Sequence, residues 1–247
     1  MEYWVAMNET ELKISLLLLE KVELAGVIHV EPDFKPEAKS LAEMLEKNFF
    51  EQTGNGVSWN PFVKMVLWTA ANAQSELSIQ SGTHMLCRLY FYDETMILLT
   101  KDMEEGLFIF YYVPLLPKAI GGIAKYLEES GVPILLNSSG KHQSTLLPAD
   151  SADDSLPLKE LLVNSVPTLI SNNLLPLTID GWCFGAHSLE NVLFRAQDEF
   201  WLASKDGENL YLNSVNFFDF IQSISRWIIR THGRSIAIGK ENTDGRI

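Results

Sequence analysis

The sequence is short of positive charge. Of its 247 residues only 19 are lysine or arginine, against 32 aspartates and glutamates, which gives a formal net charge of −13. Nucleic-acid binding requires a basic face, so this balance argues against nucleic acid as a partner. It argues equally against an anionic membrane surface. A basic or apolar protein partner is compatible with it.

Cysteine and long apolar runs are also scarce. The two cysteines, Cys87 and Cys183, lie in apolar, strand-like segments and are expected to be buried free thiols in a reducing compartment. The first residues carry no basic stretch followed by an apolar core and a small-residue cleavage site. No apolar run approaches the roughly 18 residues of a transmembrane span. We therefore expect a cytoplasmic protein without membrane insertion.

Motifs for catalysis, metal binding and phosphate binding are missing as well. The five histidines are scattered singly and have no cysteine or carboxylate at ligand spacing. No glycine-rich phosphate loop follows a strand, and no Gly-x-Ser-x-Gly elbow is present. The carboxylates fall mostly in helix exteriors and turns, where a catalytic pair has no distinguishing signal. The sequence thus predicts a protein without enzymatic activity, metal or other cofactor.

What the sequence does contain is a repeated pattern. Residues 85–112 hold three apolar, β-rich segments joined by polar turns, and a helical segment follows at 117–129. Residues 191–214 repeat this arrangement, again followed by a helical segment. Thr100-Lys101-Asp102 in the first block corresponds to Ser204-Lys205-Asp206 in the second. An internal repeat of this kind is a stronger organising signal than any single-residue motif.

Each block is expected to fold as an antiparallel meander, because short polar turns join its segments. The predicted fold class is α+β: two pseudo-repeated antiparallel β-meander units flanked by helices and related by a quasi-twofold axis. The N-terminal half spans 1–130 and the C-terminal half 157–233. A Gly-, Pro- and Ser-containing loop over 131–156 joins them, and a frayed tail is expected over 234–247.

Capping residues and apolar periodicity predict the helices. Asn8, with Glu11 three residues later, marks the start of the first helix, and Asn60 marks the start of the third. Residues 76–80 are typical of an edge strand before the first meander, and 176–180 parallel them. The helices are expected at 8–22, 36–52, 60–73, 117–129, 158–165 and 214–231, with Ser214 capping the last and Gly233 ending it.

The order of these segments resembles the EspG-type chaperones of ESX, or type VII, secretion systems. The resemblance rests on the first helix NETELKISLLLLEK, the second helix with its glycine-containing end LAEMLEKNFFEQTGNG, and the third helix PFVKMVLWTAANAQ. It continues with the strands RLYFYDETMILLTKD and LFIFYYV, and with a repeated half that ends in a long helix. The resemblance implies a quasi-twofold antiparallel-sheet protein without enzymatic activity. It also implies binding of the apolar tip of a helical secretion substrate, which is kept soluble in the cytosol before export.

The same resemblance implies a class of partner. Mycobacterial members of the family bind PE–PPE heterodimers. Because lysine, asparagine and isoleucine are plentiful in this chain while alanine and arginine are modest, a WXG100-like or LXG-type helical protein is the more expected client.

Aromatic residues indicate where such a client could bind. In 89–92 and 108–112 apolar side chains occupy both faces of the strand, so either helices cover both faces of the sheet or a partner covers one. An aromatic surface rimmed by acidic residues is typical of protein-binding faces. We expect an amphipathic helix or helix tip to pack on the aromatic side chains, while acidic turns attract a basic client. The predicted binding residues are Trp182, Phe184, Trp201, Asp102, Glu104, Glu105, Asp206 and Glu208.

Two other classes of function stay open at this point. An immunity-type inhibitor of a cognate toxin would also be small, acidic and non-catalytic, but it would bind a folded catalytic domain instead of a helical export segment. An enzyme with a novel site would show a deep pocket in which histidine and carboxylate groups converge.

Overall fold

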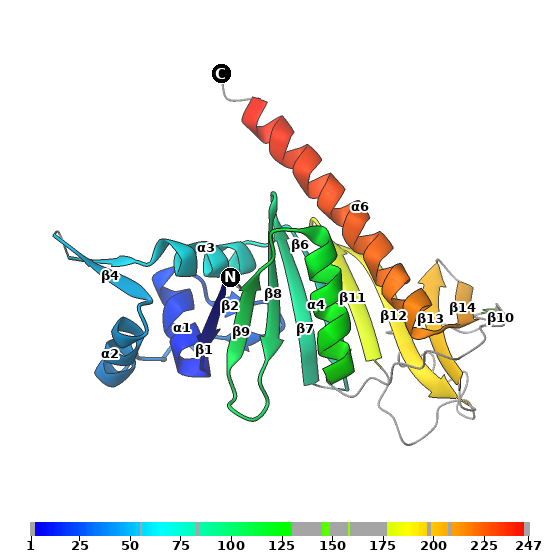
Figure 1. Cartoon of the computed structure of the whole chain (residues 1–247), viewed down its shortest axis with the longest axis horizontal. Helices are drawn as coiled ribbons and strands as arrows, with labels where there is room; N and C mark the ends of the chain where they lie inside the picture. Colours follow the sequence, from blue (N-terminus) through cyan, green and yellow to red (C-terminus); the bar gives the residue numbers. More distant parts are fainter. Residues whose placement is uncertain are drawn as a thin grey trace.

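A ten-stranded antiparallel sheet organises the molecule (Figure 1). The computed structural model describes residues 3–54, 56–82, 84–129, 145–148, 158, 177–196, 199–206 and 209–244. The strands of the sheet are β1 Trp4–Met7, β6 Ser75–Ser81, β7 His84–Tyr92, β8 Thr95–Lys101, β9 Phe108–Tyr112, β10 Thr145–Pro148, β11 Leu177–Cys183, β12 Ala186–Ala196, β13 Glu199–Asp206 and β14 Asn209–Ser214. Their order across the sheet is β1-β9-β8-β7-β6-β11-β12-β13-β14-β10.

The sheet is built from two consecutive meanders. Strands β6 to β9 form one and β11 to β14 form the other, and each strand pairs antiparallel with the next. The first strands of the two meanders, β6 and β11, pair with each other, so both meanders lie in one continuous sheet. The two edge strands, β1 and β10, come from outside the meanders.

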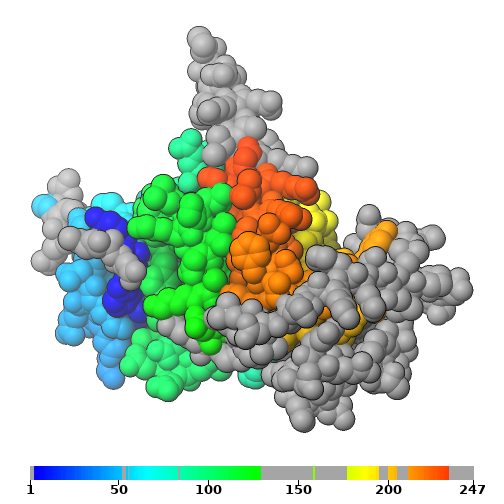
Figure 2. Space-filling view, turned by 45° about the vertical axis from the view of Figure 1, so that its right-hand side comes forward, coloured from blue at the N-terminus to red at the C-terminus, as the bar shows by residue number. Residues whose placement is uncertain are grey.

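Helices cover both faces of this sheet. Helices α4 (Leu116–Glu129) and α6 (Phe217–Asp244) lie side by side on one face (Figure 2). Their apolar residues form one core with the alternate residues of β6, β7, β8, β11 and β12. Helices α1 (Glu9–Leu18), α2 (Ala38–Glu46) and α3 (Pro61–Ala71) lie on the opposite side of the first meander, where a second core forms. The fold class is therefore α+β, as the sequence predicts.

The prediction that residues 76–80 form an edge strand is wrong. This segment belongs to β6, which lies at the centre of the sheet between β7 and β11. Ile79 pairs with Ile179, a residue far away in the sequence. Local patterning cannot show such a partner, because edge or central position depends on long-range pairing.

The capping signals of the first and third helices are confirmed. The Asn8 side chain accepts a hydrogen bond from the Glu11 amide, and the Glu11 carboxylate accepts one from the Asn8 amide, both at 2.9 Å. At α3, Asn60 Oδ1 accepts from the amides of Phe62 and Val63, and Pro61 occupies the first turn. These bonds satisfy amides that have no partner inside the helix.

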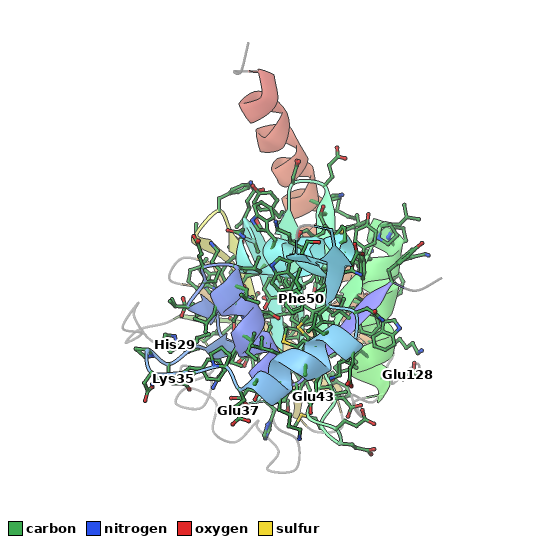
Figure 3. The ribbon with its side chains drawn as sticks, turned by 90° about the vertical axis from the view of Figure 1, so that its left-hand side faces the viewer. His29, Lys35, Glu37, Glu43, Phe50 and Glu128 are labelled. Carbon is green, nitrogen blue, oxygen red and sulfur yellow. The ribbon has the colours of Figure 1, made fainter. Side chains whose placement is uncertain are left out.

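The second helix is shorter than predicted. Helix α2 ends at Glu46, and β4 (Phe50–Thr53) and β5 (Gly56–Trp59) form a separate two-stranded hairpin instead of continuing it. The rings of Phe50 and Trp59 pack at 4.8 Å. Figure 3 shows α2 at this end of the molecule, with Phe50 above it and Glu37 and Glu43 below. A further small ribbon, β2 (Glu23–Leu24) with β3 (Ile28–His29), joins α1 to α2.

The last helix starts and ends later than predicted. Its N-cap is Asn216 instead of Ser214, since the Asp219 amide donates to Asn216 Oδ1 at 2.8 Å. The helix runs through Gly233 to Asp244 and extends past the sheet (Figure 1). Residues 234–244 of the expected tail are therefore helical in their backbone. Within the expected loop 131–156, residues 145–148 form β10, while the helix predicted at 158–165 lies outside the described residues except for Leu158.

Candidate partner-binding surface

Exposed aromatic side chains gather where the two meanders meet, on the sheet face turned away from α4 and α6. Trp182 lies at the end of β11, and its register partners are Glu76 in β6 and His187 in β12. The Trp182 and His187 rings pack at 4.8 Å. Directly paired residues of antiparallel strands point to the same face, so these three side chains form one row. We call the whole surface the junction surface and define it by Trp68, Glu76, Tyr92, Asp180, Trp182, Phe184 and His187.

Alternation along β11 explains why Trp182 faces outward. Its neighbours Gly181 and Cys183 are buried on the side of α6, where Gly181 leaves room for the Trp227 ring. Successive residues of a strand point to opposite faces. Trp182 is therefore displayed on the other face, where 42% of it is exposed.

A second pair of aromatic rings lies on the other side of β6 from the first. Trp68 of α3 packs edge-on against Tyr92 of β7 at 4.5 Å, and 39% of Trp68 is exposed. Gln74 connects this pair to the β11–β12 turn: its carbonyl accepts from the Phe184 amide at 2.7 Å, and its side chain accepts from the Asp93 amide at 3.2 Å. Aromatic groups of both meanders thus lie at the same end of the sheet.

Partly buried carboxylates lie beside these rings. Asp180 Oδ1 is 3.6 Å from His187 Nε2, and each Glu76 oxygen is 3.4 Å from Arg88 Nη1. Burial raises the pKa of Asp180; His187 opposes the rise and Glu190 adds to it. Burial also raises the pKa of Glu76, and Arg88 opposes that rise. Burial therefore disfavours the charged form of both carboxyls, although each has one cationic group nearby.

Such an arrangement suits a cation on an apolar partner. A lysine or arginine side chain would pair with the carboxylates and pack over the aromatic rings. Within the part of the chain that the structure describes, no group of three or more His, Cys, Asp or Glu side chains could hold a metal ion. Likewise, no helix among those described is long and apolar enough to cross a bilayer.

The structure brings together two of the three aromatic residues predicted to bind. Phe184 follows Trp182 at the β11–β12 turn, with a left-handed φ of 51° and 39% of it exposed. Trp201 is half-buried in β13, opposite Phe194 and Ser214. It lies toward the other end of the sheet, about 20 Å along the strand direction from Trp182, given about 3.3 Å per residue.

The predicted acidic turns lie at opposite ends of the sheet. Strands β8 and β13 run antiparallel, so the turn after β8 and the end of β13 at Asp206 are far apart. Asp102 has a local role, since its Oδ1 accepts from the amides of Glu104 and Glu105 at 2.8 and 3.0 Å. Glu104 and Glu105 are exposed, and Glu208 lies outside the described residues.

Five of the seven residues that define the junction surface are not among the binding residues predicted from the sequence: Trp68, Glu76, Tyr92, Asp180 and His187. Among them, Trp68 and Tyr92 come from separate segments of the chain. Their contribution depends on α3 packing on β7, which brings residues from separate segments together. The apolar character of Trp68 was visible, but its exposure was not.

Comparison with solved structures identifies the fold. The chain is similar to the Mycobacterium tuberculosis type VII secretion system chaperone EspG5, solved in complex with a PE25–PPE41 dimer. The TM-score is 0.60 at 11% sequence identity, over 93% of this chain and 96% of EspG5. The fold is that of EspG5. The likeness extends over nearly the whole of both chains, so it includes both meanders and the helices on both faces of the sheet. No protein-family model matches the sequence, and neither does any of the curated proteins.

Proposed function

We propose that this protein is a non-catalytic cytosolic chaperone of a type VII secretion system, which binds a helical substrate and keeps it soluble before export. Two observations support the proposal. The fold is similar to that of EspG5, a type VII secretion chaperone. The exposed aromatic rings of the junction surface provide an apolar platform for a partner.

The observation that carries the proposal is the exposure of Trp182 beside the partly buried side chains of Glu76 and Asp180. An exposed tryptophan costs free energy in water and contributes strongly to protein–protein binding when it is covered. The neighbouring Asp180 and Glu76 already lie near His187 and Arg88, and a lysine or arginine of the client would give them a further cationic partner.

These features define the client that we propose. It is a helical secreted protein, WXG100-like, LXG-like or PE–PPE-like, whose tip presents apolar side chains flanked by lysine or arginine. The exposed acidic turn at Glu104 and Glu105, together with Asp206 and Glu208, would steer a basic client electrostatically rather than contact the same tip. A chain of net charge −13 favours such steering over nucleic-acid or membrane binding.

We also infer that the two meanders are copies of one unit, related by a quasi-twofold axis between Ile79 and Ile179. These two residues are register partners at the middle of the β6–β11 pair. On either side of the pair the strands follow in the same order, and a helix follows each meander. The inferred axis would place Gly82 in the position equivalent to Trp182, so the aromatic surface would exist at one end of the sheet only.

Affinity purification from the native organism, followed by mass spectrometry, tests the proposed function. The tagged chain is expected to retain a helical type VII substrate, while the variant Trp68→Ala/Trp182→Ala loses it. Trp4→Ala is the matched control, because Trp4 is 55% exposed on the edge strand β1, four strands away from β6. Retention of a folded catalytic domain instead would favour an immunity-type inhibitor. Equal retention of the substrate by both variants would contradict the assignment of client binding to the junction surface.

A further inference from the structure

A pocket of about 600 Å³ opens between α4 and the strands β8 and β9. It lies on the sheet face that carries α4, whereas the junction surface lies on the other face. Leu98 and Thr100 of β8 and Tyr111 of β9 line it, and Tyr126 of α4 forms part of its wall. The Tyr126 hydroxyl donates to the Lys101 carbonyl at 2.9 Å, which fixes that ring. Volumes of about 300–1,000 Å³ are usual for small-molecule sites.

Two adjacent glycines in α4 shape this pocket in different ways. A Cβ at Gly122 would lie 3.1 Å from Leu98 Cδ2, so this glycine allows the helix to approach the sheet. A Cβ at Gly121 would meet nothing within 4 Å. Gly121 therefore has no packing requirement, although glycine costs a helix about 1 kcal/mol relative to alanine. The space that its missing side chain leaves belongs to the pocket.

Two lysine side chains lie on the same face of α4. Lys118 and Lys125 both line the pocket and are exposed, and with Gly121 they recur at a spacing that places them on one helix face. An apolar, tyrosine-lined cavity with lysine at its edge is complementary to a molecule with an apolar body and an anionic head. The exposed ammonium group of Lys118 at the edge of the pocket favours an anion over a cation there.

We propose that this pocket binds a small organic acid, with its acyl or aromatic body between Tyr111, Leu98 and Gly121 and its acid group at Lys118. This site is independent of the proposed chaperone function, because it shares no residue with the junction surface. Its occupant would contact α4, which packs on α6 and on the first meander.

Isothermal titration calorimetry on the full chain tests the pocket, with 1-naphthoate as the aromatic probe and octanoate as the acyl probe. Saturable one-to-one binding of at least one of them is expected. The neutral isostere 1-naphthamide should bind more weakly than 1-naphthoate. Gly121→Leu fills the pocket and should lower the affinity at least about tenfold, the factor that 1.4 kcal/mol represents. Gly121→Ala is the matched control and should retain binding within about twofold, because one methyl group occupies little of the space.

Charge reversal provides a variant that does not depend on helix packing. Lys118→Glu should lower the affinity for 1-naphthoate by about fivefold, as expected for the loss of one exposed ion pair. The affinity for 1-naphthamide should not change. Absence of saturable binding by both acids would overturn the proposal. So would equal affinity of Gly121→Leu and Gly121→Ala, or of the acid and the amide. If Gly121→Leu does not fold, the effect of Lys118→Glu on 1-naphthoate binding, compared with its effect on 1-naphthamide binding, tests the proposal.

Discussion

Trp182 is the residue on which the proposed binding depends most directly. Trp182 is 42% exposed and its ring packs against that of His187, so we expect truncation to remove little of the core. We expect Trp182→Ala to weaken client binding by about 2 kcal/mol or more, as for a central interface tryptophan, and to change the melting temperature little. Calorimetry with the purified client and a thermal melt measure the two effects.

Trp201→Ala provides the comparison for that variant. Because Trp201 is half-buried and lies toward the other end of the sheet, its truncation should lower the melting temperature more than Trp182→Ala does and leave the affinity unchanged. A loss of affinity at Trp201 with none at Trp182 would place the binding surface elsewhere.

Asp180 makes stability depend on pH. Its pKa in the folded state lies above the ordinary value of about 3.9, mainly because of burial, so the folded form binds its proton more tightly than the unfolded chain does. The free energy of unfolding therefore falls as the pH rises through the folded-state pKa of Asp180. Above that pKa the protein bears the full cost of burying the charged carboxylate. Asp180→Asn should raise the free energy of unfolding at pH 7, and this gain should shrink as the pH falls toward the ordinary pKa of an aspartate. Urea unfolding of both proteins at pH 7 and at about pH 4 measures the change in stability. A gain that does not depend on pH, or a loss at pH 7, would contradict the prediction.

Single residues also show why the site was only partly predictable. The sequence identified Trp182 and Phe184 from local aromatic density, but it did not show that Trp68 lies at the same end of the sheet. Asp102 was read as a steering charge, while its carboxylate bonds to the amides of its own turn. Exposure and hydrogen-bond partners depend on tertiary packing, which a local pattern does not contain.

At the scale of elements, an ion pair joins α1 to α2. The Glu11 carboxylate is buried and accepts from Lys47 Nζ at 2.6 Å, just past the end of α2, while its other oxygen accepts from the Asn8 amide. Lys47→Ala leaves a buried carboxylate with one bond fewer and should cost about 1–3 kcal/mol. Urea unfolding measures this. Lys39→Ala is the control in the same helix, because its pair with Glu43 is exposed and should contribute nothing measurable; an equal loss in both variants would contradict the account.

Helix α6 packs on the sheet through a glycine. A Cβ at Gly181 would lie 2.7 Å from the Trp227 ring and 2.8 Å from Leu189 Cβ, so Gly181→Ala forces α6 away from β11. We expect a loss of about 1–3 kcal/mol in the free energy of unfolding. Gly233→Ala, in an open position of α6, should instead stabilise the protein by up to about 1 kcal/mol. If Gly181→Ala left the free energy of unfolding unchanged in denaturant, α6 would not pack on β11 this closely.

Element types were easier to predict than their ends and neighbours. Asn8 with Glu11, and Asn60 with Pro61, are local signals, and the helices start where these residues indicate. Apolar periodicity extended the predicted second helix to residue 52, because such a pattern does not distinguish a helix end from the start of a hairpin. Gly233 does not end α6, since a single glycine is tolerated inside a helix at a cost of about 1 kcal/mol relative to alanine.

At the scale of the whole molecule, the pairing of β6 with β11 determines the architecture. It turns two meanders into one sheet and brings α3 of the first half close to the β11–β12 turn of the second. The sequence predicted two antiparallel units from their segment order, but it contained no local signal for the strand pair that joins them. The junction surface exists only because β6 pairs with β11. The full set of its residues could therefore not be predicted from the sequence.

Site-specific photo-cross-linking in the producing cells tests the central claim most directly. A benzophenone amino acid replaces Trp182 in one variant and Trp4 in a second, and the cross-linked partner is identified by mass spectrometry. We predict a cross-link from position 182 to the tip of a helical type VII substrate and none from position 4. Cross-links of equal yield from both positions, or from 182 to a folded catalytic domain only, would contradict the account.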